Sequence, residues 1–383
     1  MRVLIDATSI PADLGGVGRY VDALVPELVA AGVEVTVVVQ PRDKEHFASR
    51  SSADLVVAPT FVARRAARML WEQVGLARTA RRVGADVVHS PHYTMPALLP
   101  FPRAVTLHDA TFFSTPELHL RTKAAFFRRA TRRAVRHADS LIVPSQATMD
   151  EVLRYTSSSS SDAGRFRVAY HGVDTERFVP TSRAEQDRVR ATLGISEARY
   201  VGFLGTLEPR KNVPALIEGW VGAVRDLVDP PALVLAGGPG WDDRIDAAIA
   251  RVPSGLTVRR TGYLPLSDLP GFLSGATVLA YPSLGEGFGL PVLEAMSCGA
   301  TVLTTRELSL PEVGGDAVAY CGTDARSIQE ELTRLLADDR ARSDLAARAI
   351  VRAGEFSWAA AASAHIDAYE RAIAHHATKS SRG

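Results

Sequence analysis

Short runs of β-branched and aliphatic residues alternate along the chain with longer stretches whose apolar positions recur at helical spacing. In the first half, strands are predicted at Val3–Ile5, Val33–Val39, Leu55–Val57, Val87–Val88, Ala104–Leu107, Leu141–Val143 and Arg167–Tyr170. Helical patterns lie at about 62–83 and 117–138. Strands that are apolar along their whole length and alternate with helices are typical of a parallel sheet covered on both faces.

The same alternation restarts after about residue 195. Strands are predicted at Val201–Leu204, Ala232–Ala236, Leu256–Thr261, Val278–Tyr281 and Thr301–Leu303, and helices at about 211–225, 241–251 and 288–297. The pattern therefore predicts an α/β protein with two doubly wound parallel-sheet domains of the Rossmann type facing a cleft. Ligands of such sheets bind beyond the carboxyl ends of the strands.

The domain limits follow from the segments between these patterns. We expect a first domain at 1–172, a linker at 173–195 and a second domain at 196–355. The segment 356–383 contains a last helical pattern, Trp358–Ala374, which is available to pack back on the first domain. The run Ser157–Ser161 is of low complexity and predicts a surface loop.

Composition is that of a globular protein. The chain has 383 residues, of which 46% are hydrophobic and 23% charged, and this excludes a disordered or fibrous chain. The only cysteines are Cys298 and Cys321, which favours a reducing compartment. No apolar run approaches the roughly 20 residues that span a bilayer, and Asp6 ends the first apolar run early. We expect a cytoplasmic protein.

The formal net charge of +1 hides an asymmetry between the halves. Residues 1–172 hold 22 Lys/Arg and 16 Asp/Glu, whereas residues 173–383 hold 22 and 27. The low total charge disfavours a protein that binds nucleic acid over its whole surface.

The richest candidate chemistry follows the predicted strand Val278–Tyr281. Glycines at 285, 287 and 289 allow a tight turn and close approach of the backbone to a ligand. A helix is predicted to start near Leu290, and its first N–H groups make an anion site. Glu286 lies in the loop and Glu294 in the helix, where carboxylates can accept hydrogen bonds from sugar hydroxyls. The alternative is that both are ordinary solvated glutamates.

A second candidate follows the strand Val201–Leu204. After Gly205 and Thr206, the adjacent cations Arg210 and Lys211 stand at a predicted helix start. Cations oppose the helix dipole there, so a functional role is favoured over an ordinary basic helix end. Together they could neutralise a diphosphate and stabilise it as it leaves.

The first half offers weaker signals. His108 follows the strand Ala104–Leu107, and Gly15 and Gly16 open a helix after the first strand. A lone histidine is as easily structural, and the glycines do not make a GxGxxG fingerprint, which argues against a dinucleotide dehydrogenase. There is no P-loop, and no Asp-x-Asp pair follows a strand to hold a metal on a diphosphate. We therefore expect no cofactor and no metal.

The whole set of motifs resembles the family 4 retaining glycosyltransferases (group 1 glycosyltransferases) of GT-B fold. The landmarks are the Glu-x7-Glu run from Glu286 to Glu294 and, in the family's order, the segments 205–212, 236–240, 261–264 and 171–174. With Gly15-Gly16 and His108 they cover nearly the whole chain. The resemblance implies a first domain that binds the acceptor and a second that binds a nucleotide sugar.

The resemblance also implies roles for single residues. Arg210 and Lys211 would bind the donor diphosphate, Glu294 the ribose, and Glu286 the donor sugar. His108 would lie beside the transferred sugar. The other donor-binding positions implied are Gly16, Gly205, Thr206, Tyr263, Leu264, Gly287, Phe288, Gly289 and Leu290. Many members have Arg where this chain has Thr206, so either Arg210 or Lys211 could carry the leaving group.

The implied reaction moves a hexose from a nucleotide diphosphate sugar to a glycan, lipid-linked or small-molecule acceptor. Mannose is favoured as the hexose because the 208–212 segment resembles that of members that use GDP-mannose. The negative charge of the diphosphate would be balanced by Arg210, Lys211 and the N-terminal ends of helices, without a metal ion. The alternatives are a GT-B sugar-nucleotide epimerase and a non-catalytic nucleotide-sugar-binding subunit.

Two basic helical stretches carry much of the charge of the first half, one at 64–82 and one at 121–136. In the second, Phe127, Ala130 and Ala134 share one helical face and five arginines the other. Such a helix either lies on an anionic membrane or exposes its basic face to solvent. The first would place the protein at the inner face of the membrane.

Overall fold

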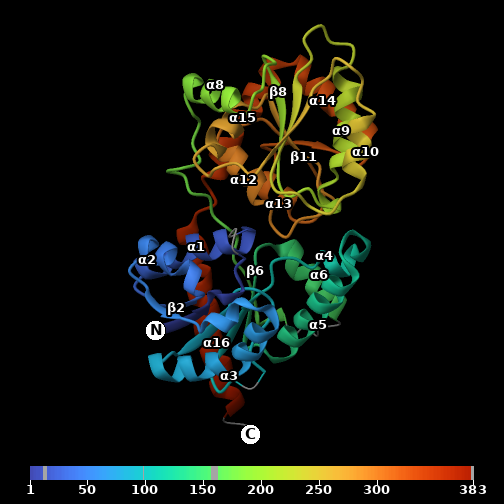
Figure 1. Ribbon diagram of the computed structural model, residues 1–383. Helices are drawn as coiled ribbons and strands as arrows, with labels where there is room; N and C mark the ends of the chain where they lie inside the picture. Colours follow the sequence, from blue (N-terminus) through green and yellow to red (C-terminus); the bar gives the residue numbers. More distant parts are fainter. Residues whose placement is uncertain (12–14, 98, 157–162, 381–383) are drawn as a thin grey trace. The chain divides into compact units, whose positions relative to one another are not determined.

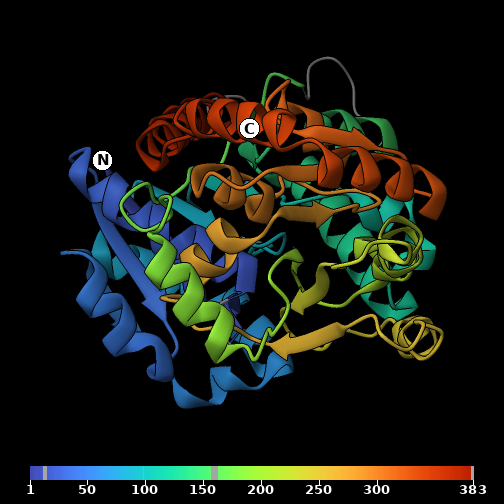
Figure 2. The same cartoon turned by 90° about the horizontal axis from the view of Figure 1, so that it is seen from above.

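The computed structural model describes residues 1–11, 15–97, 99–156 and 163–380. The chain forms two compact units, whose helices and strands are drawn in Figure 1 and, seen from above, in Figure 2. Unit 1 contains Met1–Gly172 and Ser357–Gly383, and unit 2 contains Val173–Phe356. The serine run predicted as a surface loop, at 157–161, lies outside the described residues.

Unit 1 is built on a seven-stranded parallel sheet of order β3-β2-β1-β4-β5-β6-β7. Its strands are β1 Arg2–Asp6, β2 Glu34–Val39, β3 Asp54–Val57, β4 Val87–Ser90, β5 Arg103–Thr106, β6 Ser140–Val143 and β7 Phe166–Val168. The helices are α1 Gly15–Ala30, α2 Lys44–Arg50, α3 Arg65–Val83, α4 Thr111–Ser114, α5 Arg121–His137, α6 Gln146–Thr156 and α16 Trp358–Ser380. The strand order reverses between β1 and β4, which marks the ligand-binding edge of such sheets.

Helices cover both faces of this sheet because successive strand residues point to opposite sides. Val3 and Ile5 of β1 pack in one core cluster with residues of α1 and α16. Leu4, between them, packs in another cluster with Leu76 and Ala80 of α3. A strand buried on both faces needs apolar residues at every position, which is the pattern that the sequence has.

Unit 2 repeats the design with a six-stranded parallel sheet of order β10-β9-β8-β11-β12-β13. The strands are β8 Tyr200–Leu204, β9 Ala232–Ala236, β10 Val258–Gly262, β11 Val278–Tyr281, β12 Val302–Thr305 and β13 Ala319–Cys321. The helices are α8 Arg183–Thr192, α9 Val213–Val224, α10 Arg244–Ala250, α11 Leu269–Gly275, α12 Leu290–Ser297, α13 Leu310–Gly314, α14 Ala325–Ala337 and α15 Asp339–Ala353. Two doubly wound parallel sheets confirm the predicted fold class.

The segment 173–195, which we expected to be a linker, is part of unit 2 in the structure and contains α8. Val189 of α8 is buried in the core of unit 2, and Gly271 of α11 lies against it. The short strand β13 and the helices α14 and α15 also lack a counterpart in the predicted elements. Over the described part of the chain, no helix is long and apolar enough to cross a membrane.

Helix α16 is joined to the rest of unit 1 by a chain of buried hydrogen bonds. The Tyr20 hydroxyl lies 2.5 Å from His365 Nε2 and 3.0 Å from Thr106 Oγ1. His89 Nε2 lies 2.8 Å from the same threonine oxygen, and its Nδ1 lies 3.0 Å from the Tyr369 hydroxyl. His365 and Tyr369 belong to α16, so the network joins that helix to α1, β4 and β5.

Both histidines of this network are neutral at neutral pH. Burial lowers the pKa of His365 from 6.5 to about 4, and it lowers the pKa of His89 well below 6.5. His365 Nδ1 donates to the Ala361 carbonyl at 2.7 Å, which leaves Nε2 to accept from Tyr20. The network therefore depends on rings that carry one proton each.

We predict that acid destabilises unit 1 through these histidines. The unfolded chain binds protons below about pH 6.5 while the folded rings stay neutral, so stability is complete above that pH and falls toward the folded pKa of about 4. Each such histidine costs about 1.4 kcal/mol per pH unit in this window. In urea unfolding between pH 7 and pH 4.5, His365→Gln should make the pH dependence shallower by about one proton.

The matched control is Tyr369→Phe, which removes a hydroxyl of the same network and no histidine. It should lower the free energy of unfolding at every pH with an unchanged slope. Equal slopes for His365→Gln and the parent protein would contradict the prediction.

Candidate functional site

Two loops of unit 2 meet where the strand order of its sheet reverses. One follows β8 and the other follows β11, which is the next strand in the sheet. Arg210 and Lys211 end the first loop in a short 3-10 turn, and Asn212 then adopts a left-handed conformation that starts α9. The side chain of Asn212 donates to the Thr323 carbonyl at 2.7 Å, which fixes the turn. The two cations are thereby aimed at the loop that follows β11.

The two loops are joined by the carboxylate of Glu286. Its Oε1 lies 2.6 Å from Lys211 Nζ, 2.6 Å from Ser283 Oγ and 3.0 Å from the Tyr281 hydroxyl. Its Oε2 lies 2.5 Å from Arg210 Nη1. Glu286 is 7% exposed, as is Lys211. Both oxygens of a buried carboxylate are therefore satisfied, and its orientation is determined by donors from two loops.

Tyr281 lies under this ion pair. Its hydroxyl accepts from Lys211 Nζ at 2.5 Å and donates to Glu286, while Nζ lies 4.9 Å from the centre of its ring. Burial raises the pKa of Tyr281 well above its usual value of 10, and the charge of Glu286 adds to the effect. The phenol stays neutral and links the cation to the carboxylate.

Electrostatics keep the carboxylate charged in spite of its burial. Burial alone would raise the pKa of Glu286, but Arg210 and Lys211 outweigh it and lower that pKa to about 2. Burial and the neighbouring Arg210 lower the pKa of Lys211, and Glu286 opposes this. Arg210 also pairs with Glu208 at 2.6 Å. Two cations thus face two carboxylates, and an anionic ligand would compete with those carboxylates for the cations.

Glycines let a third loop, after β9, press against the loop after β8. A Cβ on Gly240 would lie 1.9 Å from the Leu207 carbonyl oxygen, and one on Gly237 would lie 2.1 Å from the Gly205 carbonyl oxygen. The Leu207 amide donates to the Gly238 carbonyl at 3.1 Å. The glycines of the 236–240 segment therefore permit backbone contact between loops.

The loop from Glu286 to Leu290 is held by its backbone at the start of α12. The hydroxyl of Ser309 shares its proton between the carbonyl oxygens of Glu286 and Phe288, which lie 2.8 and 3.0 Å from its Oγ. Gly289 has φ +103, and its Cβ would meet Leu310 at 3.0 Å. The first N–H groups of a helix have no partner within it, so the start of α12 is suited to an anion. Leu290 begins this helix, and Gly287, Phe288 and Gly289 directly precede it. Glu294, in α12, is 2% exposed.

The remaining predicted residues of unit 2 lie at the ends of its strands. Gly205 and Thr206 directly follow β8 and are partly buried. Tyr263 directly follows β10 and is 63% exposed, and its ring lies beside Gly238, whose added Cβ would be 2.4 Å from it. Leu264 packs against the core. An exposed ring beside the loop after β9 is a platform on which a planar group can stack.

The predicted residues of unit 1 lie at the ends of β1 and β5. His108 Nε2 donates to the Pro91 carbonyl at 2.7 Å, and burial lowers the pKa of His108. Its Nδ1 is therefore an acceptor in the neutral ring. Gly16 lies in the first turn of α1, and an added Cβ there would meet nothing within 4 Å. Part of the loop before it, at 12–14, lies outside the described residues.

Three residues of the unit 2 site were not among the predicted site residues. They are Tyr281, Ser283 and Glu208, which hold Lys211, Glu286 and Arg210 respectively. A tyrosine at the end of an otherwise aliphatic strand, and a serine three residues before Glu286, were the available signals. Among the described residues, no group of three or more His, Cys, Asp or Glu side chains is arranged to hold a metal ion.

Each of the two units matches a known protein-family model over most of its length. Residues 14–177 match the Glycosyltransferase Family 4 model, and residues 185–352 match the Glycosyl transferases group 1 model. O-antigen chain mannosyltransferase B of Escherichia coli is 31% identical over 287 residues, 74% of each chain. A D-inositol 3-phosphate glycosyltransferase of Corynebacterium glutamicum is 30% identical over 271 residues, which are 68% of this chain and 62% of that protein.

Solved structures share the fold. The HepE protein of Anabaena in complex with UDP and glucose has a TM-score of 0.74 at 18% identity, covering 96% of this chain and 98% of its own. Sucrose-phosphate synthase of Thermosynechococcus elongatus has a TM-score of 0.77 at 20% identity, covering 98% and 99%. At these identities the likeness supports the GT-B fold alone.

Proposed function

The chain belongs to the group 1 glycosyltransferases of GT-B fold, and from this premise we propose that it transfers a hexose from a nucleotide diphosphate sugar to an acceptor hydroxyl with retention of anomeric configuration. The observation that carries the proposal is the Glu286 carboxylate, held by Lys211 and Arg210 beside a helix start at the ligand-binding edge of unit 2. Cations and a fixed carboxylate side by side suit a ligand that has a diphosphate and a sugar.

In this proposal the diphosphate binds to Arg210, Lys211 and the N–H groups at the start of α12. Catalysis of such a transfer is mainly positioning and stabilisation of charge on the leaving diphosphate. Glu286 stays ionised because its pKa is about 2. When the diphosphate takes Arg210 and Lys211 as partners, the oxygens of Glu286 that these cations occupied would accept hydrogen bonds from hydroxyls of the donor sugar. Glu294 would accept hydrogen bonds from the ribose, and the base would lie near Tyr263 and Leu264.

His108 would lie beside the transferred sugar as a hydrogen-bond acceptor. Its Nε2 is occupied by the Pro91 carbonyl, and its neutral ring leaves Nδ1 to accept from a sugar hydroxyl. A proton-bearing acceptor hydroxyl would transfer its proton to the leaving phosphate on the same face of the sugar. The first turn of α1, at Gly16, presents backbone without a side chain and would approach the diphosphate.

We favour mannose as the sugar and guanosine as the base. The Escherichia coli relative is a mannosyltransferase, which supports this choice. The Anabaena neighbour was solved with UDP and glucose, which makes a uridine donor the competing choice. For the acceptor we favour a lipid-linked glycan, because the basic helices α3 and α5 suit contact with an anionic membrane.

We predict that a panel of GDP, UDP, ADP and dTDP shows the largest rise in melting temperature with GDP. A ligand that binds only the folded state stabilises it in proportion to the logarithm of its affinity. Tyr263→Ala should reduce the shift, because the ring supplies stacking for the base. A larger shift with UDP or dTDP would contradict a mannose-type donor.

We predict that Lys211→Ala lowers turnover by about 100-fold, because a positioned charge at the leaving group is lost. The fold should survive, since Glu286 keeps Arg210, Ser283 and Tyr281 as partners. Release of nucleoside diphosphate measures turnover, and circular dichroism measures the fold. Arg326→Ala removes an exposed cation of α14 and serves as the control. Near-normal turnover of Lys211→Ala would refute the diphosphate assignment.

We predict that the transfer is metal-independent, because Arg210, Lys211 and the helix start meet the charge of the diphosphate. Enzyme and substrates treated with EDTA should keep their activity. Activity that is abolished by EDTA and restored by Mg²⁺ would overturn this part of the proposal without touching the transfer itself.

A further inference from the structure

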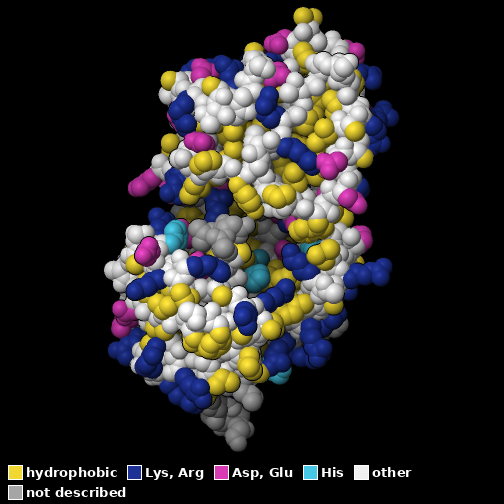
Figure 3. All heavy atoms as spheres, viewed as in Figure 1, with side chains coloured by type: hydrophobic (Ala, Val, Ile, Leu, Met, Phe, Trp, Pro, Cys, Tyr) yellow, Lys and Arg dark blue, Asp and Glu magenta, His cyan; other side chains and the backbone are white. Residues whose placement is uncertain are grey.

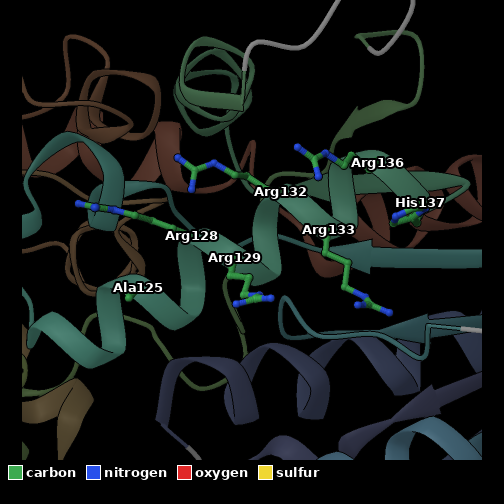
Figure 4. Close-up of a pocket in the computed structure, with 7 residues that line it drawn as sticks. All are labelled: Ala125, Arg128, Arg129, Arg132, Arg133, Arg136 and His137. Atoms are coloured by element: carbon green, nitrogen blue, oxygen red, sulfur yellow. The ribbon is translucent and has the colours of Figure 1, made fainter.

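Figure 4 shows five arginines along the exposed face of α5. These arginines differ in their partners. Arg128 donates to the Phe112 carbonyl at 2.6 Å, and Arg132 lies over the Phe113 ring at 5.1 Å. Within the described part of the chain, Arg129, Arg133 and Arg136 have neither a hydrogen bond nor an ion pair. Such uncompensated cations on one helix face attract a ligand with phosphate groups.

Two of these unpaired arginines also border an apolar groove between α3 and α5. The groove has a volume of about 290 Å³, close to the smallest small-molecule sites. Its apolar wall contains Met69 of α3, Met95 of the loop after β4, and Phe126 and Ala130 of α5. Flexible methionine side chains are typical of surfaces that accept apolar chains of variable shape. Arg129 and Arg133 line the same groove.

One carboxylate faces this groove, and its charge is already compensated. Glu72 of α3 is 2% exposed and lies 3.1 Å from Arg68 Nη1 and 2.7 Å from Thr94 Oγ1. Burial raises the pKa of Glu72, and Asp6 raises it further. Glu72 is on α3, whereas Arg129 and Arg133 are on α5, so the two walls differ in charge. An anionic group is therefore favoured at the α5 wall.

Exposed apolar side chains also lie on the outer surface of α3, outside the groove. Leu70 is 71% exposed and Val74 is 46% exposed, one helical turn apart. Figure 3 shows hydrophobic side chains among Lys and Arg side chains on unit 1, over the region where Figure 1 places these helices. The apolar groove that Arg129 and Arg133 border fits a ligand with an apolar chain beside a charge. A free sugar phosphate has no such chain.

We propose that the groove between α3 and α5 binds the lipid phosphate of the acceptor, with the phosphate on Arg129 and Arg133 and the hydrocarbon chain against Met69, Met95 and Phe126. This inference rests on the proposed transfer to a lipid-linked acceptor and adds a site for the lipid. Arg132 and Arg136, which do not line the groove, contribute only a general attraction to anionic surfaces.

Calorimetric titration of the full chain with dodecyl phosphate, below its critical micelle concentration, tests the groove. We expect binding that Arg129→Gln/Arg133→Gln weakens at least about tenfold, because two charge-assisted hydrogen bonds are lost. The matched control Arg132→Gln/Arg136→Gln removes the same charge from the same helix and should change affinity little. Ala130→Phe, which fills the groove and keeps every arginine, should also weaken binding.

Three outcomes would overturn the proposal. If both double variants weaken the binding of dodecyl phosphate equally, the attraction is diffuse and electrostatic. In that case both variants should also lose binding to phosphatidylglycerol vesicles to the same extent in a sedimentation assay. Inorganic phosphate that binds as tightly as dodecyl phosphate would exclude a chain subsite. If dodecyl phosphate does not bind but nucleotide still raises the melting temperature, the lipid site in the groove is refuted and the proposed transfer stands. If dodecyl phosphate binds but no nucleotide raises the melting temperature, the proposed transfer is refuted and the lipid site stands.

Discussion

The unit 2 site depends on one interaction, the burial of Glu286 against two cations. A carboxylate in a low-dielectric interior is costly unless it is paired and fully hydrogen-bonded. Here Lys211 and Arg210 pair with it, and Ser283 and Tyr281 complete its hydrogen bonds. Because the cations follow β8 and the carboxylate follows β11, the same contact holds two loops together and fixes two cations and a carboxylate side by side at the carboxyl edge of the sheet.

The parallel sheet makes this contact possible. β8 and β11 are neighbours in the sheet although β9 and β10 lie between them in the sequence, and both carboxyl ends open at the same edge. The loop after β9 completes the edge, since Gly237 and Gly240 admit the backbone of the β8 loop at distances that any side chain would block. These close backbone contacts hold the loops in defined positions, which the proposed positioning mechanism requires.

The sequence was informative wherever an element is buried on both faces, and less so elsewhere. Strands such as Ala232–Ala236 and Val278–Tyr281 were predicted at their observed bounds because every position is apolar. β13 has three residues, too few to show a period, and α8 has only one buried residue, Val189, so its polar sequence resembled a linker. The contact of Tyr281 with Lys211 could not be predicted, because it depends on the register of two strands and on the rotamers of both side chains.

The structure shows where the charges behind the asymmetry of the sequence lie and which of them are paired. The site in unit 2 is nearly balanced, since Glu208 and Glu286 offset Arg210 and Lys211. A net excess of acid in that half is therefore compatible with an anion site, because the relevant electric field is local.

In unit 1 the charge balance differs: Arg129, Arg133 and Arg136 of α5 lack partners among the residues that the structure describes. Unpaired arginines are hydrated when no ligand is bound, and they gain most from a phosphate that is held close and partly out of water. The apolar groove that Arg129 and Arg133 border supplies such a position, and it is there that the proposed site for an amphiphilic phosphate lies.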